Sequence, residues 1–125
     1  MSDAGDIQPG AFIMFNREPC RVKRREIVTA GTHMHSKLKF YVQGLFSMQE
    51  KVVTFAHKDN VEEAEVEFNA GQLIMITGKT CQIMDTRTYE TKDAEVSEDI
   101  ASTLKENDVV SYVTYQGRSI ILGRK

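Results

Sequence analysis

The sequence predicts an all-β protein built as two small barrels with one short helix. Its apolar residues fall mostly in short runs that are rich in β-branched and aromatic side chains and that end at turn residues. Only the stretch 97–105 has the pattern of a helix. The chain has 125 residues, a length that suits one ordinary domain or two barrels of roughly 60 residues each.

The first half of the chain has the pattern of a small barrel that carries a long hairpin. Leu38, Phe40 and Val42 alternate with polar side chains, which is the period of two expected when one face of a strand packs and the other meets solvent. The preceding strand is dominated by basic residues and is expected to be exposed on one side. Between these two strands lies the tip segment, residues 29–37. The strands expected in this half are 12–15, 20–28, 37–42, 52–55 and 61–68.

The second half has the strand order of an OB-fold. Ser97 is expected to cap a short helix that runs to Lys105. Three strands, this helix and two further strands match the order of the five-stranded OB barrel, which often binds oligonucleotides, although a small barrel that binds nothing fits the same pattern. A junction at Asn69-Ala70-Gly71 gives the domains 1–68 and 69–125. The strands expected in the second domain are 73–76, 81–84, 89–96, 109–115 and 119–122.

Charge is distributed unevenly along the chain. Seven basic and two acidic side chains lie between Arg17 and Lys39, a local net charge of +5, and because the whole chain carries −2 the remainder carries −7. A basic edge on an acidic body suits a protein that docks one face on RNA phosphates, while a solvated hairpin with no partner is the alternative. The residues predicted to contact RNA phosphates are Arg21, Lys23, Arg24, Arg25, Lys37 and Lys39.

Other site chemistries find little support in the sequence. Cys20 and Cys81 are far apart and are expected to be buried apolar residues, without a disulfide or a zinc site. His33 and His35 supply two ligands at most, so we predict no metal site, and His57 is expected to make a local hydrogen bond. The chain lacks phosphate-binding and hydrolase motifs, so we expect neither an enzyme nor a cofactor. Tyr89, Tyr112 and Tyr115 could stack on bases, but packing is the commoner role of such residues and we assign them no site.

The sequence also indicates where the protein is located. It has no apolar run of about 18 residues, and its first residues lack the basic flank and apolar core of a signal peptide. We therefore expect a cytoplasmic protein without a membrane segment.

Four segments of the chain resemble translation initiation factor 5A of the archaeal type, the counterpart of bacterial elongation factor P. The resemblance implies an SH3-like first barrel followed by an OB-fold. It also implies a factor that is not an enzyme, has no small-molecule substrate and is monomeric when free. Such a factor binds ribosomal RNA between the exit and peptidyl sites and touches the acceptor end of the peptidyl-tRNA. The segments are 9–13, 18–22, the glycine-histidine tip, and 82–91.

The tip departs from the family pattern at the residue that matters most there. In the family the tip resembles Lys-Thr-Gly-Lys-His-Gly-His-Ala-Lys, and its second lysine is converted to hypusine, a long cationic side chain. That lysine corresponds to Thr32, which has no amine to modify. Gly31, His33 and His35 match the pattern, whereas Met34 replaces a glycine and would be strained in a conformation with positive φ.

Three interpretations of Thr32 remain open. The chain is an unhypusinated paralogue that docks in the same ribosomal site, or it keeps the ordinary stimulatory role with His33 or His35 at the acceptor end. The third interpretation is a role away from the ribosome, either in binding another RNA or in self-assembly as a structural protein on the same scaffold. Binding to RNA that salt weakens would favour the first two, and self-association on adding salt would favour assembly.

Overall fold

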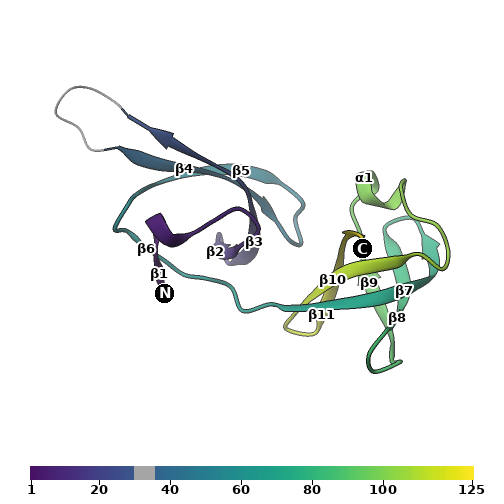
Figure 1. The fold of residues 1–125 in the computed structure, drawn as a ribbon. Helices are drawn as coiled ribbons and strands as arrows, with labels where there is room; N and C mark the ends of the chain where they lie inside the picture. Colours follow the sequence, from purple (N-terminus) through teal and green to yellow (C-terminus); the bar gives the residue numbers. More distant parts are fainter. Residues whose placement is uncertain (30–35) are drawn as a thin grey trace. The chain divides into compact units, whose positions relative to one another are not determined.

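The computed structural model describes residues 1–29 and 36–125. The predictions for Gly31, Thr32, His33, Met34 and His35 therefore lie outside the described residues. The chain divides into two compact units, Met1–Glu65 and Val66–Lys125. Figure 1 shows the elements of each unit, and β3 and β4 are the strands that flank residues 30–35.

The first unit is a curled antiparallel sheet with the strand order β2-β3-β4-β5 (Figure 1). A short pair, β1 with β6, and one turn of 3-10 helix, η1, complete the unit. Every connection within the sheet is between neighbours in sequence, as expected of successive hairpins. The elements are β1 (Ser2–Asp3), η1 (Ala4–Asp6), β2 (Phe12–Phe15), β3 (Glu18–Val28), β4 (Lys37–Gly44), β5 (Glu50–Ala56) and β6 (Asn60–Val61).

The core of the first unit lies on one face of this sheet. Leu38, Phe40 and Val42 of β4 are buried there, as their alternation predicts. The rings of Phe40 and Phe55 pack at 5.7 Å between centres, and Ile7 of the N-terminal segment closes the cluster. Because side chains of a strand alternate between faces, the residues of β4 between these buried ones point to the opposite face of the sheet.

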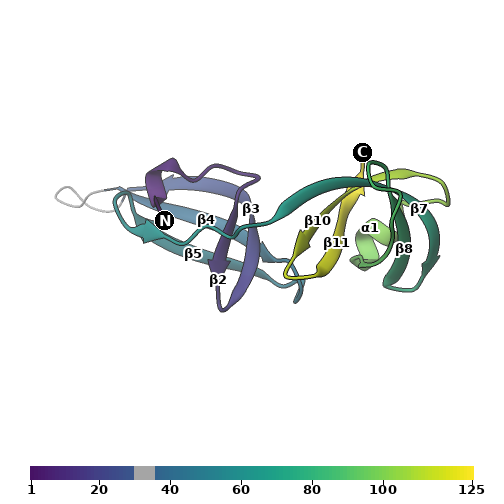
Figure 2. The same ribbon diagram turned by 90° about the horizontal axis from the view of Figure 1, so that it is seen from below.

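The second unit is a closed five-stranded barrel with the order β10-β11-β9-β8-β7. Its short helix lies against the barrel (Figure 2), where Ile100 and Ala101 pack on the buried cluster. Ser97 caps the helix as predicted, its hydroxyl accepting a hydrogen bond from the Ile100 N–H. The elements are β7 (Glu67–Thr77), β8 (Thr80–Asp85), β9 (Thr91–Glu95), α1 (Glu98–Ala101), β10 (Val109–Tyr115) and β11 (Arg118–Arg124).

The structure differs from the sequence-based prediction between residues 61 and 71. The expected strand 61–68 is reduced to β6, which ends at Val61, and Asn69-Ala70-Gly71 lies inside β7 rather than at a junction. The division into units falls at Glu65 and Val66. The glycine serves close packing, since a Cβ at Gly71 would lie 3.3 Å from Ile83 Cδ1.

The helix is also shorter than predicted. It ends at Ala101 instead of Lys105 because the following residues turn: the Thr103 N–H donates to the Ile100 carbonyl. The Lys105 N–H donates to the Asp108 carboxylate.

Both cysteines are buried, which confirms their expected role as small core residues. Burial, with the nearby Glu18 carboxylate, raises the pKa of Cys20 to about 11, and burial also raises the pKa of Cys81. Both side chains are therefore neutral thiols at physiological pH. Among the described residues, no helix has the length and apolarity that a membrane span requires.

Candidate nucleic-acid interface

The exposed face of the first sheet gathers basic side chains. Side chains alternate between the two faces of a strand, so Lys39 and Tyr41, which flank the buried Phe40, point away from the core. Residues that pair directly across antiparallel strands point to the same face. On β3, Glu26 pairs with Lys39 and Arg24 pairs with Tyr41. We call this solvated side of β3, β4 and β5 the outer face.

A β-bulge in β3 decides which basic residues share the outer face. The register shifts between Val22 and Arg24, and Lys23 is the extra residue. Val22 pairs with the buried Val42, so strict alternation would turn Arg24 toward the core. The bulge instead returns Arg24 to the outer face, and Arg21, which pairs with Gln43, lies there too.

Arg25 points the other way. It pairs with the buried Phe40, and its guanidinium donates a hydrogen bond to the Ile7 carbonyl at 3.3 Å. The structure thus places five of the six predicted residues on the outer face and directs the sixth, Arg25, toward the N-terminal segment. The five are Arg21, Lys23, Arg24, Lys37 and Lys39.

Tyr41 is the centre of a polar network on the outer face. The Arg24 guanidinium carbon lies 4.0 Å from the centre of the Tyr41 ring, and the Lys39 ammonium lies 5.2 Å from it. Glu26 holds both partners in place: its carboxylate accepts from the Tyr41 hydroxyl at 3.2 Å and lies 3.0 Å from Arg24 Nη2. Interaction with Tyr41, and then with Glu26, raises the pKa of Arg24, so the guanidinium stays charged.

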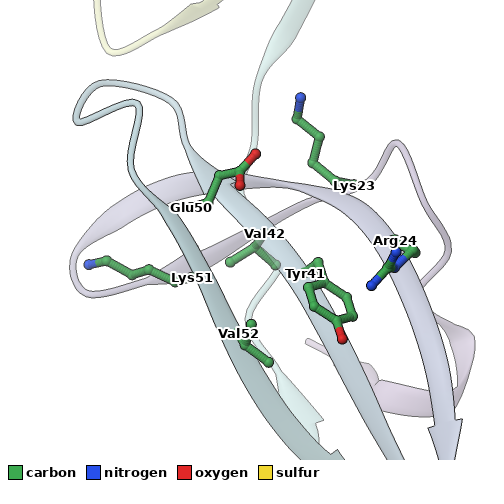
Figure 3. Close-up of a pocket in the computed structure, with 7 residues that line it drawn as sticks. All are labelled: Lys23, Arg24, Tyr41, Val42, Glu50, Lys51 and Val52. Atoms are coloured by element: carbon green, nitrogen blue, oxygen red, sulfur yellow. The ribbon is translucent and has the colours of Figure 1, made fainter.

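Beside this network the outer face is hollowed (Figure 3). The cavity has a volume of about 530 Å³. Tyr41 and Val52, two of the residues that line it, are cross-strand partners, and Val52 is 51% exposed. The residues that line it are Lys23, Arg24, Tyr41, Val42, Glu50, Lys51 and Val52.

The start of β4 is tied to the loop that follows β5. Ser36 Oγ and His57 Nε2 are 2.9 Å apart, so His57 makes a hydrogen bond as expected, but its partner lies 21 residues away rather than nearby in the sequence. The Gly5 N–H also donates to the His57 carbonyl at 3.0 Å. These bonds join three segments at the end of the hairpin that adjoins the tip segment.

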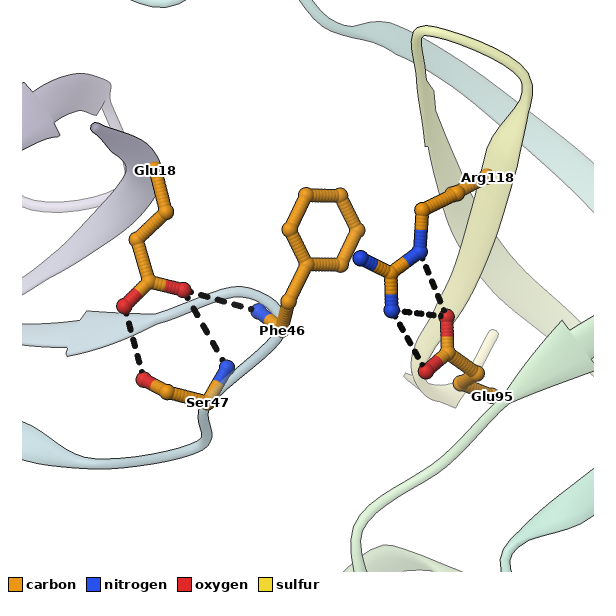
Figure 4. A network of polar contacts seen from close by, with 5 residues as sticks. All are labelled: Glu18, Phe46, Ser47, Glu95 and Arg118. Carbon is orange, nitrogen blue, oxygen red and sulfur yellow. Dashed lines mark hydrogen bonds and ion pairs between the residues drawn. The ribbon is translucent and has the colours of Figure 1, made fainter.

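The opposite end of the hairpin is held by a carboxylate (Figure 4). Glu18 accepts from the backbone N–H groups of Phe46 and Ser47 at 3.3 and 3.1 Å, and from the Ser47 hydroxyl at 2.7 Å. The Glu18 contacts position the start of β3 against the turn after β4.

In the second unit, Arg118 forms a two-pronged ion pair with Glu95, with its shortest N–O distance at 2.8 Å. The Arg118–Glu95 ion pair joins the start of β11 to the end of β9.

Sequence reasoning did not identify Tyr41 and Val52 as members of a site. Tyr41 carried a signal, because it alternates with Lys37 and Lys39 on the solvated side of a predicted strand. Val52 carried none, since an apolar residue in a strand is ordinarily expected to pack. Of the tyrosines in the second unit, Tyr112 is fully buried and is unavailable for stacking, whereas Tyr89 is 73% exposed.

Within residues 1–29 and 36–125, no group of three or more histidine, cysteine, aspartate or glutamate side chains is arranged to hold a metal ion. On the outer face, the pairing of β3 with β4 gathers cations around one aromatic ring. Such a surface binds polyanions and planar groups without covalent chemistry.

The architecture defines the class of protein: a two-domain β-protein in which an SH3-like sheet precedes an OB-type barrel. The chain is 32% identical over 121 residues to translation initiation factor 5A of Desulfurococcus amylolyticus, covering 94% of this chain and 92% of that protein. It is also 32% identical over 123 residues to the factor of the same name from Metallosphaera sedula, covering 97% and 94%. The chain belongs to the translation initiation factor 5A family.

Solved structures agree with this assignment. The eukaryotic translation initiation factor 5A from Methanococcus jannaschii superposes with a TM-score of 0.74 at 26% identity, over 99% of this chain and 92% of that chain. A family protein from Naegleria fowleri has a TM-score of 0.63 at 20% identity, which shows the shared fold. No protein-family model matches the chain. The predicted family and the predicted two-barrel fold are confirmed, and the chain is a translation factor by homology.

Proposed function

We propose that this translation factor docks on the ribosome near the exit and peptidyl sites as an unhypusinated member of its family. Its outer face contacts ribosomal RNA and its tip approaches the acceptor end of the peptidyl-tRNA. The observation that carries the proposal is the placement of five basic residues on the two strands that flank the tip segment. Cations grouped on one face give binding dominated by phosphate contacts.

Thr32 determines what the factor can do once it is docked. Its side chain is short, neutral and without an amine, so it cannot carry the long cation that the family places there. The chain therefore occupies the site without a hypusine contact to the tRNA. In this role it acts in the cytoplasm, is monomeric when free, and performs no reaction of its own.

Sedimentation of cell lysate through a sucrose gradient tests the docking. We expect the protein to migrate with ribosomes at low salt and to leave them at raised salt, because counterions compete for the phosphates. Replacing Lys23 and Lys39 by glutamine should weaken the association. A protein that stays at the top of the gradient at low salt contradicts the proposal, and one that pellets without ribosomes indicates self-assembly.

Mass spectrometry of protein purified from its native cells tests the second part. Cleavage after Arg25 and Lys37 releases the peptide 26–37, which contains Thr32. We expect this peptide at its unmodified mass. An added aminobutyl group would show that the tip is modified at another residue.

A further inference from the structure

We propose that the hollow on the outer face binds one unstacked nucleotide of a single-stranded RNA segment. The base lies against Tyr41, Arg24 and Val52, and the adjoining phosphates lie toward Lys23 and Lys39. The inference rests on the proposed function for its partner, RNA, and adds which form of RNA is recognised and by which residues.

The size of the hollow fits this occupant. Its volume of about 530 Å³ lies within the range of roughly 300 to 1,000 Å³ that is typical of small-molecule sites. It therefore has room for one nucleoside and its phosphate. A duplex keeps its bases stacked and paired, so it can offer the hollow only its backbone.

The stacking surface is already ordered without RNA. The Arg24 guanidinium lies 4.0 Å from the Tyr41 ring centre, and Glu26 bonds to both side chains. In Figure 3 the Tyr41 ring lies between Arg24 and Val52. Aromatic rings and guanidinium planes are the surfaces on which proteins stack single-stranded bases. Because Glu26 restrains both side chains, binding costs less side-chain entropy than it would for unrestrained ones.

Val52 supplies the apolar part of the surface. It is 51% exposed although it sits opposite Tyr41 on neighbouring strands. A solvated β-branched side chain in the middle of a cationic face gains free energy when an apolar surface covers it. The flat face of a base covers Val52 and brings its phosphate among the surrounding cations.

The charges around the hollow orient the nucleotide. Glu50 and Lys23 lie at the same end of the lining, where the carboxylate repels phosphate and the exposed ammonium attracts it. Lys51 does not compete for the phosphate on this face, because it pairs with the inward-facing Val42 and its ammonium lies 5.7 Å from the Phe15 ring. Lys39 lies on the opposite side of Tyr41 from Glu50. We therefore expect one adjoining phosphate toward Lys39 and the other toward Lys23.

Fluorescence anisotropy with a labelled single-stranded RNA of ten nucleotides and with the matching duplex tests the proposal on the full-length protein. Tyr41→Leu removes the ring and keeps an apolar side chain in the strand. We expect it to weaken single-strand binding at least about fivefold, since one stacked base contributes on this scale. Duplex affinity should change by less than about twofold, because the cations remain. Tyr89→Leu, at the exposed tyrosine of the second unit, is the matched control and should bind like the wild type.

The outcomes separate this inference from the proposed function. If Tyr41→Leu binds the single strand as tightly as the wild type while both still bind ribosomes, the hollow is not a nucleotide site and the ribosomal proposal stands. If the wild type binds neither ribosomes nor RNA, both proposals fail. Tight binding of an acidic peptide that the single strand cannot displace would identify the hollow as a protein-docking site and overturn the inference.

Photo-crosslinking gives a readout that does not depend on a variant. The wild-type protein is irradiated with the same RNA carrying 4-thiouridine, then digested after lysine and arginine. We expect the main adduct on the peptide 40–51, which contains Tyr41 and lies between Lys39 and Val52. Adducts confined to peptides of the second unit would refute the assignment.

Discussion

The Tyr112 hydroxyl group donates a buried hydrogen bond to the Asp85 carboxylate and so joins β10 to the end of β8. The other carboxylate oxygen accepts from the backbone N–H groups of Arg87 and Thr88 at 2.8 and 2.9 Å. One carboxylate therefore holds a tyrosine of the barrel wall and the turn that leads to β9. This relationship also explains why Tyr112 offers no stacking surface to a ligand.

Removing the hydroxyl should destabilise the second unit. In Tyr112→Phe the buried Asp85 loses a donor that no solvent replaces, and a buried group left without a partner costs about 1 to 3 kcal/mol. Urea denaturation, followed by hydrogen exchange of peptides from 66–125, measures the loss. Tyr89→Phe removes a hydroxyl from an exposed side chain and should leave the free energy of unfolding within about 0.5 kcal/mol of the wild-type value. Equal effects in the two variants would contradict this account.

Asp85 should also make the stability of the second unit depend on acid. The hydrogen bond from Tyr112, with those from the backbone of Thr88 and Arg87, lowers the pKa of Asp85 from 3.8 to about 2. Because the pKa of Asp85 is lower in the folded than in the unfolded protein, its ionised carboxylate stabilises the folded state above about pH 4. This stabilisation is lost as the pH falls toward 2. The shift corresponds to about 2 kcal/mol.

Asp85→Asn tests this dependence, because an amide does not titrate. We expect the variant to be less stable than the wild type at pH 7, and to lack the part of the decline between pH 4 and pH 2 that Asp85 supplies. The free energy of unfolding of both proteins is measured across this interval. An unchanged acid dependence in the variant would assign the decline to other carboxylates.

In the first unit, Gly44 makes room for the Glu18 network. A Cβ at this position would lie 2.3 Å from Ser47 Oγ and 2.5 Å from Glu18 Oε1. Both atoms belong to side chains that can move, but moving them breaks the hydrogen bond of 2.7 Å between them. Gly44→Ala is therefore expected to lower the free energy of unfolding by about 1 to 2 kcal/mol.

A double-mutant cycle checks that mechanism. If the cost of Gly44→Ala arises from displacing Glu18, it should shrink by at least about 0.5 kcal/mol when Glu18 is already alanine. Thermal unfolding of the wild type, the two single variants and the double variant supplies the four values. Additive losses would mean that the added methyl group acts through the backbone instead.

The strands of the hairpin could be predicted from sequence, but their faces only in part. Leu38, Phe40 and Val42 reveal the buried face of β4 because their alternation is local. The bulge at Lys23 is not local: it appears only when β3 is paired with β4, and it reverses the directions of the residues after it. Arg24 and Arg25 are neighbours and point to opposite faces in any regular strand, but only the bulge decides that Arg24 rather than Arg25 reaches the outer face.

Gly71 shows a second limit of local patterns. Asparagine, alanine and glycine in succession predict a junction, since glycine is common in turns. In the structure the residue lies within β7, and a Cβ there would lie 3.3 Å from Ile83 Cδ1, Met84 O and Tyr112 Cε1. The need for glycine comes from partners on β8 and β10, which no window of sequence around Gly71 contains. The hollow beside Tyr41 is beyond local patterns for the same reason, because the residues that line it come from paired strands.

The outer face makes a quantitative prediction about salt. Each phosphate contact contributes roughly 0.7 to 0.9 to the slope of the logarithm of affinity against the logarithm of salt concentration. Replacing Lys23 and Lys39 by glutamine should lower the magnitude of that slope for ribosome binding by roughly 1.5 and weaken binding most at low salt. Lys105→Gln with Lys125→Gln removes the same charge from exposed positions of the second unit and should leave the slope unchanged. If both pairs lower the slope equally, net charge rather than the outer face governs binding, and the bulge at Lys23 has no role in recognition.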